Sequence, residues 1–218
     1  MGRIASLCYA RFVKNGTPLA LVSTDNCSHN GDKLKAGVMA YVDAWKQAGK
    51  VDDDFVSYME EKVSFPWSMI DKITPRPDEK VKEMLEKDGF EDTDLIITSR
   101  NTYTAPFVNS EETGYLVIED NFPNGRPPLE KAGIVFTDRE TVDKVEKMKV
   151  CTCLNPLHTA LAIYGCMLGH TSIHDEMEDK ELSQLIQKMC YEEAMSVVVN
   201  PGVIAVSYTH LRAHETRH

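Results

Sequence analysis

Residues 18–31, PLALVSTDNCSHNG, join an apolar run to a polar turn that lies directly ahead of a helical pattern. The run over 18–23 predicts a short buried strand, because it is apolar and is bounded by turn-forming residues. Beyond the turn, apolar residues recur at spacings of three and four as far as Gly49, where the helix is expected to end. They are Leu34, Val38, Tyr41, Val42 and Trp45. A strand that passes through a polar turn into an amphipathic helix is typical of an α/β fold.

The same kinds of pattern predict the remaining elements. Helices are expected over 52–62 and 77–88, and strands over 95–98, 115–118 and 133–136. After Asp138 the pattern becomes helical throughout, with helices expected over 138–149, 156–168 and 180–195. The sequence therefore predicts a mixed α/β first part, a mainly α-helical second part, and a boundary near 137–150.

The composition excludes several classes of protein. The 218 residues are 42% hydrophobic and 27% charged, which is typical of a folded chain that buries a core without disulfide or metal staples. The formal net charge of −10 disfavours nucleic acid and anionic membranes as partners. No apolar run approaches the roughly 20 residues of a membrane helix, and residues 1–16 carry no signal-peptide pattern. We therefore expect a cytoplasmic protein with no nucleic-acid or membrane partner, and its oligomeric state stays open.

Cysteine and histidine spacing bears on metal binding. None of the six cysteines forms a C-x-x-C pair, which favours free thiols over a zinc framework. His170 and His174 stand four apart, a spacing that can bind a metal on a helix. Gly169 and the following Thr171-Ser172, however, predict a turn here. We expect no metal site, and metal binding through the two histidines is kept as an alternative.

Residues 149–158, KVCTCLNPLH, place polar side chains at the start of an apolar helix. Asn155 ahead of Pro156 predicts a helix start, with asparagine as the N-cap and proline at the first helical position. Asn155 and His158 are three apart and therefore share one side of the first turn. Small residues on the face of His158 leave room for a ligand or for another backbone. The alternative is an asparagine that only caps the helix and a histidine that only forms a hydrogen bond.

Four motifs, in order along the chain, resemble those of the mannitol dehydrogenase family of polyol-specific long-chain dehydrogenases. They are Asp25-Asn26 with Asn30-Gly31, then 63–75 (VSFPWSMIDKITP), 115–133 (YLVIEDNFPNGRPPLEKAG) and 154–169 (LNPLHTALAIYGCMLG). In the second motif, Ile70 and Lys72 replace the usual valine and arginine. The stretch over 151–166 is most similar to the fructuronate reductase branch. Together the motifs cover nearly all of residues 1–204.

The resemblance implies the second half of a Rossmann-like cofactor domain over 1–137 and the start of a helical substrate domain over 138–204. It implies an NAD-dependent oxidoreductase that interconverts a sugar acid or polyol and its keto form, with NADP left open as the cofactor. D-mannonate and fructuronate are the expected pair, and mannitol is the alternative substrate. A partial domain without a catalytic role is the alternative from another class.

The resemblance also implies the catalytic residues. Lys149 would be the base, the amides of Asn155 and Asn26 would stabilise the alkoxide, and His158 would orient the substrate hydroxyl. A lysine base must have its pKa lowered well below about 10 to work near neutral pH, which burial or a nearby positive charge can achieve.

The usual spacing from the lysine to the asparagine of this motif is five residues, whereas Lys149 and Asn155 are six apart. Lys147 and Lys144 are therefore alternatives for the base.

Five further assignments rest on the same motifs. Asp71 and Arg126 are expected to contact the substrate, and an arginine fork would suit the carboxylate of a sugar acid. Asp25, Asn26 and Ser68 are expected to contact the cofactor.

Two features indicate a piece of a longer enzyme. A nicotinamide enzyme needs a glycine-rich phosphate turn, and none of the twelve glycines forms a G-x-G pair. We therefore expect this chain alone to bind NAD weakly or not at all. Residues 205–218 are also out of character, because SYTHLRAHETRH over 207–218 resembles translated sequencing adapter. We expect a foreign tail there, and a natural basic tail is the alternative.

Overall fold

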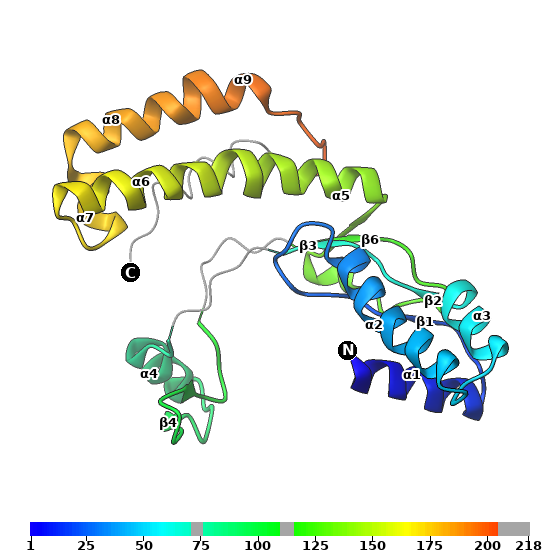
Figure 1. Ribbon diagram of the computed structural model, residues 1–218. Coiled ribbons are helices and arrows are strands. Elements are labelled where there is room, and N and C mark those ends of the chain that lie inside the picture. The colour runs from blue at the N-terminus through cyan, green and yellow to red at the C-terminus, as the bar shows by residue number, and fades with distance from the viewer. Residues whose placement is uncertain (71–75, 110–115, 205–218) are drawn as a thin grey trace. The chain divides into compact units, whose positions relative to one another are not determined.

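The computed structural model describes residues 1–70, 76–109 and 116–204 (Figure 1). It divides into two compact units, of which the larger combines Met1–Ile70 with Leu116–His218 and the smaller is Asp71–Tyr115. Asp71 and the tail over 205–218, both singled out from the sequence, lie outside the described residues.

The larger unit begins with a β-α-β arrangement. Strand β1 (Leu19–Ala20) runs parallel to β2 (Val63–Ser64), and helices α2 (Asn30–Gln47) and α3 (Asp53–Glu61) lie between them in the chain. Parallel neighbours need such a crossover, because a tight turn cannot join them. The strand predicted over 18–23 and both predicted helices are confirmed, whereas β2 was not predicted.

The first residues of the chain form a helix that the sequence analysis left unassigned. Helix α1 (Gly2–Lys14) buries Ala5 and Cys8, and the ring centroid of Phe12 lies 5.4 Å from that of Phe55 on α3. Apolar residues at spacings of three and four carry the signal that could have found it. The core of this part consists of Ala5, Cys8, Val38, Val42, Phe55, Tyr58, Met59, Val63 and Phe65.

Helix α2 begins very close to the segment that follows β2. A Cβ atom on Gly31 would lie 2.4 Å from the carbonyl oxygen of Phe65 and 2.8 Å from that of Pro66. Both neighbours are backbone atoms, which cannot rotate away as a side chain can. Glycine at position 31 therefore allows the helix to approach this segment.

Gly31→Ala is expected to lower the free energy of unfolding by about 1–3 kcal/mol, because the added methyl forces a backbone shift in a packed region. Gly37→Ala is the matched control on the same helix, since its Cβ would meet only the flexible side chain of Met1, at 3.0 Å. Alanine there is expected to be neutral, or stabilising by up to about 1 kcal/mol. Urea denaturation of the two variants measures the difference, and equal midpoints would contradict the close approach.

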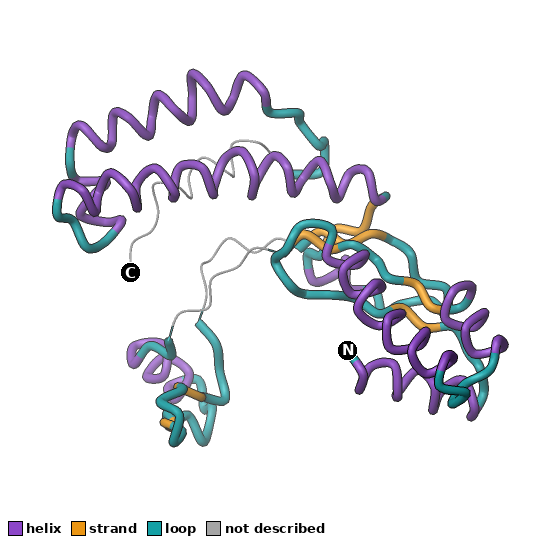
Figure 2. Tube along the Cα trace, viewed as in Figure 1, coloured by secondary structure: helices purple, strands orange, loops and turns teal. Residues whose placement is uncertain are grey.

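A second sheet of three strands follows in the larger unit. Strand β6 (Val117–Glu119) lies between β3 (Ser68–Met69), which is antiparallel to it, and β7 (Val135–Thr137), which is parallel. A short 3₁₀-helix, η1 (Leu129–Ala132), precedes β7. All the strands are short, and most of the chain is helix or loop (Figure 2). Strands β6 and β7 confirm two predicted strands, whereas β3 was not predicted.

The smaller unit contains one helix and one hairpin. Helix α4 (Glu79–Lys87) confirms the helix predicted over 77–88, and β4 (Ile96–Ile97) lies within the strand predicted over 95–98. Strand β5 (Tyr103–Thr104), which the sequence analysis did not predict, pairs with β4 in antiparallel fashion. Lys82 Nζ lies 3.0 Å from Asp94 Oδ1 and ties the helix to the segment ahead of β4.

One unbroken helix follows β7 and corrects a prediction. Helix α5 (Arg139–Glu146), the π-helix η2 (Lys147–Leu154) and helix α6 (Asn155–Leu168) are continuous over 139–168. The prediction of a new helix with Asn155 as its N-cap was wrong, because Asn155 has helical torsions of φ −61° and ψ −41°. Pro156 lacks a backbone N–H, and the π-helical turn before it supplies the local change of hydrogen bonding that an interior proline requires.

The helix over 139–168 is long and apolar enough to meet a length and composition test for a membrane span, and it is the single such helix among the described residues. Only 28% of its most apolar window is buried within the structure. The test by itself is weak evidence, since core helices of globular proteins meet it too.

The last helices build a second core. Helices α7 (Ile173–Glu178) and α8 (Lys180–Lys188), the π-helix η3 (Met189–Ala194) and helix α9 (Met195–Val197) follow α6. The core shared by α6, α8 and η3 consists of Leu157, Ala160, Leu161, Leu182, Ile186 and Cys190. The predicted boundary after residue 137 falls between β7 and α5, which belong to the same compact unit. The two-domain division there stays a prediction.

Candidate active site

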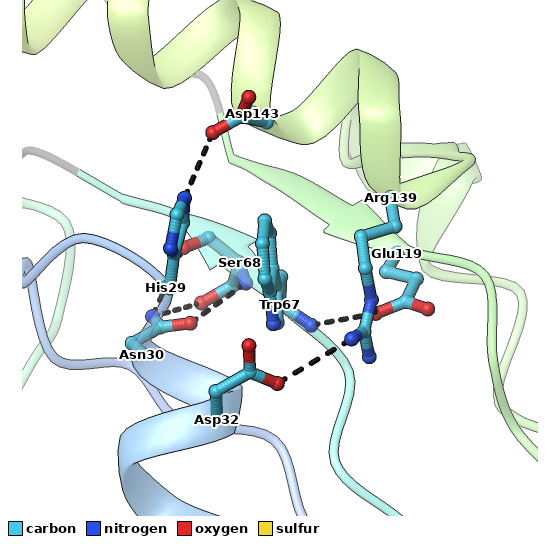
Figure 3. A network of polar contacts seen from close by, with 8 residues as sticks. All are labelled: His29, Asn30, Asp32, Trp67, Ser68, Glu119, Arg139 and Asp143. Atoms are coloured by element: carbon cyan, nitrogen blue, oxygen red, sulfur yellow. Dashed lines mark hydrogen bonds and ion pairs between the residues drawn. The ribbon is translucent and has the colours of Figure 1, made fainter.

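Asn30 holds the turn over 23–30 against strand β3 (Figure 3). The residue is 1% exposed, and its Nδ2 donates to the carbonyl of Asp25 at 2.8 Å and to Ser68 Oγ at 2.9 Å. Its Oδ1 accepts the backbone N–H of Ser68 at 3.0 Å. The hydroxyl of Ser68 donates to the carbonyl of Ser23. Ser68, a predicted cofactor ligand, therefore uses both its N–H and its hydroxyl inside the protein, which favours a structural role.

Asp25 and Asn26 lie in the turn that Asn30 braces. Both side chains are exposed, and the turn follows the carboxyl end of β1. In α/β folds, ligands bind in the crevice at the carboxyl ends of the parallel strands. The position of the two side chains is therefore suited to the cofactor role that the resemblance implies, while Asn30 supplies the rigidity.

A stack of three side chains stands next to this turn, and the sequence analysis missed it. The His29 ring lies parallel to Trp67, with centroids 4.1 Å apart, and the Arg139 guanidinium lies 4.8 Å from the Trp67 ring. The indole lies between them (Figure 3). Trp67 belongs to the quoted motif over 63–75, but no local spacing pairs it with residue 29 or 139.

The structure separates the three lysines that compete for the role of base. Lys149 is 2% exposed, whereas the side chains of Lys147 and Lys144 are 68% and 40% exposed. The hydrogen bond of Lys147 to Asp143, at 2.6 Å, and that of Lys144 to Glu140, at 2.7 Å, raise the pKa of each amine. A raised pKa keeps an amine protonated, so Lys149 is the lysine whose burial fits a base.

The π-helix explains the unusual spacing to Asn155. An α-helix closes each turn with a bond from residue i to i+4, and a π-helix with one from i to i+5, so that each π turn holds one more residue. Lys149 and the five residues after it lie in η2, which ends at Leu154. The sixth step in the sequence is thus taken up by the wider turn, which favours the same relative direction that five residues would give on an α-helix.

The other two predicted catalytic residues follow on the same helix. Asn155 is exposed, and His158 is half-buried one turn later. Thr159 donates its hydroxyl to the carbonyl of Asn155 at 2.8 Å, which leaves the side-chain amide of Asn155 available at the surface. The buried amine and the exposed amide therefore stand on one rigid element, which is the placement that a precise site needs.

Arg126 is held by partners within the protein. Its Nε and Nη2 lie 2.8 and 3.1 Å from the two carboxylate oxygens of Asp120, and its Nη1 lies 2.7 Å from Glu130 Oε2. Its guanidinium stacks 3.4 Å from the centroid of Phe136. A substrate carboxylate would have to displace these contacts, so the geometry favours a role in holding the loop over 120–130.

The two histidines considered for metal binding lie apart in the structure. Helix α6 ends at Gly169, which has φ +89°, and α7 starts after Ser172, so His170 lies in the connection and His174 in the helix. His170 Nε2 lies 3.7 Å from Asp179, and His174 Nε2 lies 3.7 Å from Glu178. Across residues 1–70, 76–109 and 116–204, no group of three or more metal-ligating side chains comes together. The metal alternative therefore has no support in the described part.

Several carboxylates of the larger unit have pKa values below the usual range. Hydrogen bonds from Thr141 lower the pKa of Asp138, and those from the backbone of Leu182 and Glu181 lower that of Asp179. For Asp143, burial acts to raise the pKa, but hydrogen bonds from Lys147 and His29 outweigh it.

A lowered pKa means that the native chain binds protons less readily than the unfolded chain. The free energy of unfolding is therefore expected to fall as the pH drops below about 4, the ordinary value for aspartate. Urea denaturation between pH 7 and pH 3 measures this. Asp138→Asn should make the loss shallower, and a constant free energy from pH 5 to pH 3 would contradict the expectation.

The fold and the site together define a Rossmann-type α/β protein that continues into a long helix with a buried lysine. The description "Mannitol dehydrogenase Rossmann domain" matches residues 2–131. The chain belongs to the mannitol dehydrogenase family, as the four motifs implied.

Three relatives illustrate the similarity. D-mannonate oxidoreductase of Thermotoga maritima is 54% identical over 206 residues, which are 94% of this chain and 38% of that protein. Polyol:NADP oxidoreductase of Gluconobacter oxydans is 30% identical over 194 residues, 88% of this chain and 36% of that protein. The solved structure of Pseudomonas fluorescens mannitol 2-dehydrogenase, a ternary complex with NAD and D-mannitol, is 25% identical with a TM-score of 0.69 and covers 96% of this chain and 39% of that one. The chain thus spans little more than a third of their length.

Proposed function

We propose that the chain is part of a nicotinamide-dependent oxidoreductase that interconverts D-mannonate and fructuronate. The burial of Lys149 on the helix that also carries Asn155 and His158 is the observation that carries the chemistry. The substrate follows from identity, since 54% to a D-mannonate oxidoreductase stands well above 30% to a polyol oxidoreductase. Mannitol is the second candidate substrate.

In the direction of oxidation, the substrate hydroxyl loses its proton to Nζ of Lys149. The amide N–H groups of Asn155 and Asn26 donate to the alkoxide oxygen as charge builds there, in the manner of an oxyanion hole. His158, one turn after Asn155, orients the hydroxyl. The cofactor, when bound, accepts the hydride from the carbinol carbon. In reduction the same groups act in reverse, and Lys149 returns the proton to the new hydroxyl.

The chain offers a partial fit to NAD. The exposed turn with Asp25 and Asn26 stands at the carboxyl end of β1, where this class of fold binds its ligand. Ser68 is engaged internally, and the sequence contains no G-x-G turn for the pyrophosphate. We therefore propose that these two residues contribute to a NAD site that this chain does not complete, and that the isolated chain binds NAD weakly.

A chimera tests the function. Residues 1–204 of this chain replace the matching segment of the Thermotoga maritima D-mannonate oxidoreductase, so that Lys149, Asn155 and His158 come from this chain. We expect fructuronate-dependent oxidation of NADH, with fructose, the keto form of mannitol, at least tenfold poorer in kcat/KM. A folded chimera that prefers fructose would favour the mannitol alternative. A folded chimera without turnover would overturn the proposal, and turnover by the 218-residue chain alone would overturn its partial cofactor site.

A further inference from the structure

The stack of His29, Trp67 and Arg139 joins segments that are far apart in the sequence. His29 stands at the end of the turn that carries Asn26, Trp67 precedes β3, and Arg139 is the first residue of α5. The rings of His29 and Trp67 are nearly parallel, with an interplanar angle of 15°, and the guanidinium of Arg139 completes the stack (Figure 3).

Both outer members of the stack are tied to helix α5. His29 Nε2 lies 2.9 Å from Asp143 Oδ1, and Asp143 is one helical turn beyond Arg139. Arg139 Nε donates to Glu119 Oε2 at 3.0 Å, and the same oxygen accepts the backbone N–H of Trp67 at 3.0 Å. Glu119 on β6 thus anchors the inner end of the stack, and Asp143 closes the outer end.

The backbone of His29 is held in an unfavourable conformation. Its φ of 53° and ψ of 44° lie in the left-handed region, which costs free energy in any residue with a Cβ atom. The conformation accompanies the placement of the ring against Trp67 and Asp143. A strained residue that makes its contacts with a distant helix, rather than with its own segment, points to a role in orienting the two.

We propose that the stack of His29, Trp67 and Arg139, closed by Asp143, is a clasp that positions the turn of Asn26 relative to the helix of Lys149. Helix α5 continues without a break into η2 and α6, so a contact that fixes its first turn also directs the side chains further along. Asn26 is three residues from His29 on the other side of the clasp. These are positioning residues, and the inference rests on the proposed function of Lys149 and Asn26.

Variants of the active chimera test the clasp. His29→Phe keeps a ring against Trp67 and removes the bond to Asp143, and Asp143→Ala removes the same bond from the other side. Each is expected to lower kcat about tenfold, the loss for one well-placed contact, with KM for NADH changed less than twofold. The double variant should be no slower than either single one, because both remove the same contact.

Three controls separate positioning from general damage. Asp143→Asn keeps an oxygen acceptor for His29 and should retain most of kcat. Lys147→Met removes the other partner of Asp143 and should change kcat less than threefold. His174→Phe makes the same chemical change as His29→Phe on the exposed face of α7, and kcat should stay unchanged. Unchanged kcat in His29→Phe and Asp143→Ala, or additive losses in the double variant, would overturn the clasp.

Hydrogen exchange of the 218-residue chain provides a readout that needs no activity. In His29→Phe, the amides over 23–28 should exchange about tenfold faster than in the parent chain, while those of α3 keep their rates. Equal rates over 23–28 would overturn the clasp. An inactive parent chimera would instead count against the proposed function, and the exchange rates would still decide whether the contact orders the turn.

Discussion

Lys149→Met in the chimera is expected to lower kcat by about 10²- to 10⁴-fold, the usual contribution of a general base. Methionine is an unbranched, uncharged side chain of similar length, so the buried site is filled and the amine alone is lost. Steady-state oxidation of NADH with fructuronate measures the effect. A thermal unfolding transition within a few degrees of the parent would show that the fold survives.

The matched variants for this test are the neighbouring lysines. Lys147→Met and Lys144→Met each remove an exposed amine that is paired with a carboxylate on its own helix. Exposed pairs of this kind contribute little, about 0.3–0.5 kcal/mol, so kcat should stay within threefold. If Lys149→Met retains its activity and one of the other variants loses it, the base lies elsewhere on the helix and the assignment is wrong.

Asn30→Ala is expected to lower the free energy of unfolding by about 3–5 kcal/mol, near the upper end for single substitutions. The amide donates to the carbonyl of Asp25 and to Ser68, and accepts the N–H of Ser68. Alanine leaves these buried groups without their partner, and each such group costs about 1–3 kcal/mol. Urea denaturation of the 218-residue chain measures the loss.

Asn124→Ala is the control for this substitution. Asn124 is exposed in the loop over 122–128, so the same change of residue type should shift the free energy of unfolding by no more than about 0.5 kcal/mol. If Asn30→Ala is as stable as Asn124→Ala, the turn over 23–30 is not held by this side chain. The structural account of the N-G pair would then be wrong.

Local patterns predicted most of the helices and the longer strands. The strand over 18–23 and the helices after it were predictable because their apolar spacing repeats within a single element. Strands β2, β3 and β5 have two residues each, too few for any alternation to show. The helix break predicted at Asn155 failed for a different reason. The Asn-Pro pair is a strong local signal for a helix start, and the π-helix ahead of it overrides that signal.

The candidate site was predictable in part. The motif around Asn155 and His158 led to the family and to three rival lysines. Spacing alone could not choose among the lysines, because burial is a property of packing. The same limit applies to Arg126, whose partners Asp120 and Glu130 are near in sequence but whose engagement depends on the folded loop.

From its motifs alone, this sequence determined the α/β fold, the family and the segments that carry the candidate chemistry, since each of these is written in residues close together in the chain. The tertiary structure decided which lysine is buried, that Ser68 serves the fold, and that His29 meets Asp143 across 114 positions of sequence. The physical reason is that burial and long-range contacts arise only when distant segments pack, and no local spacing records which segments will meet.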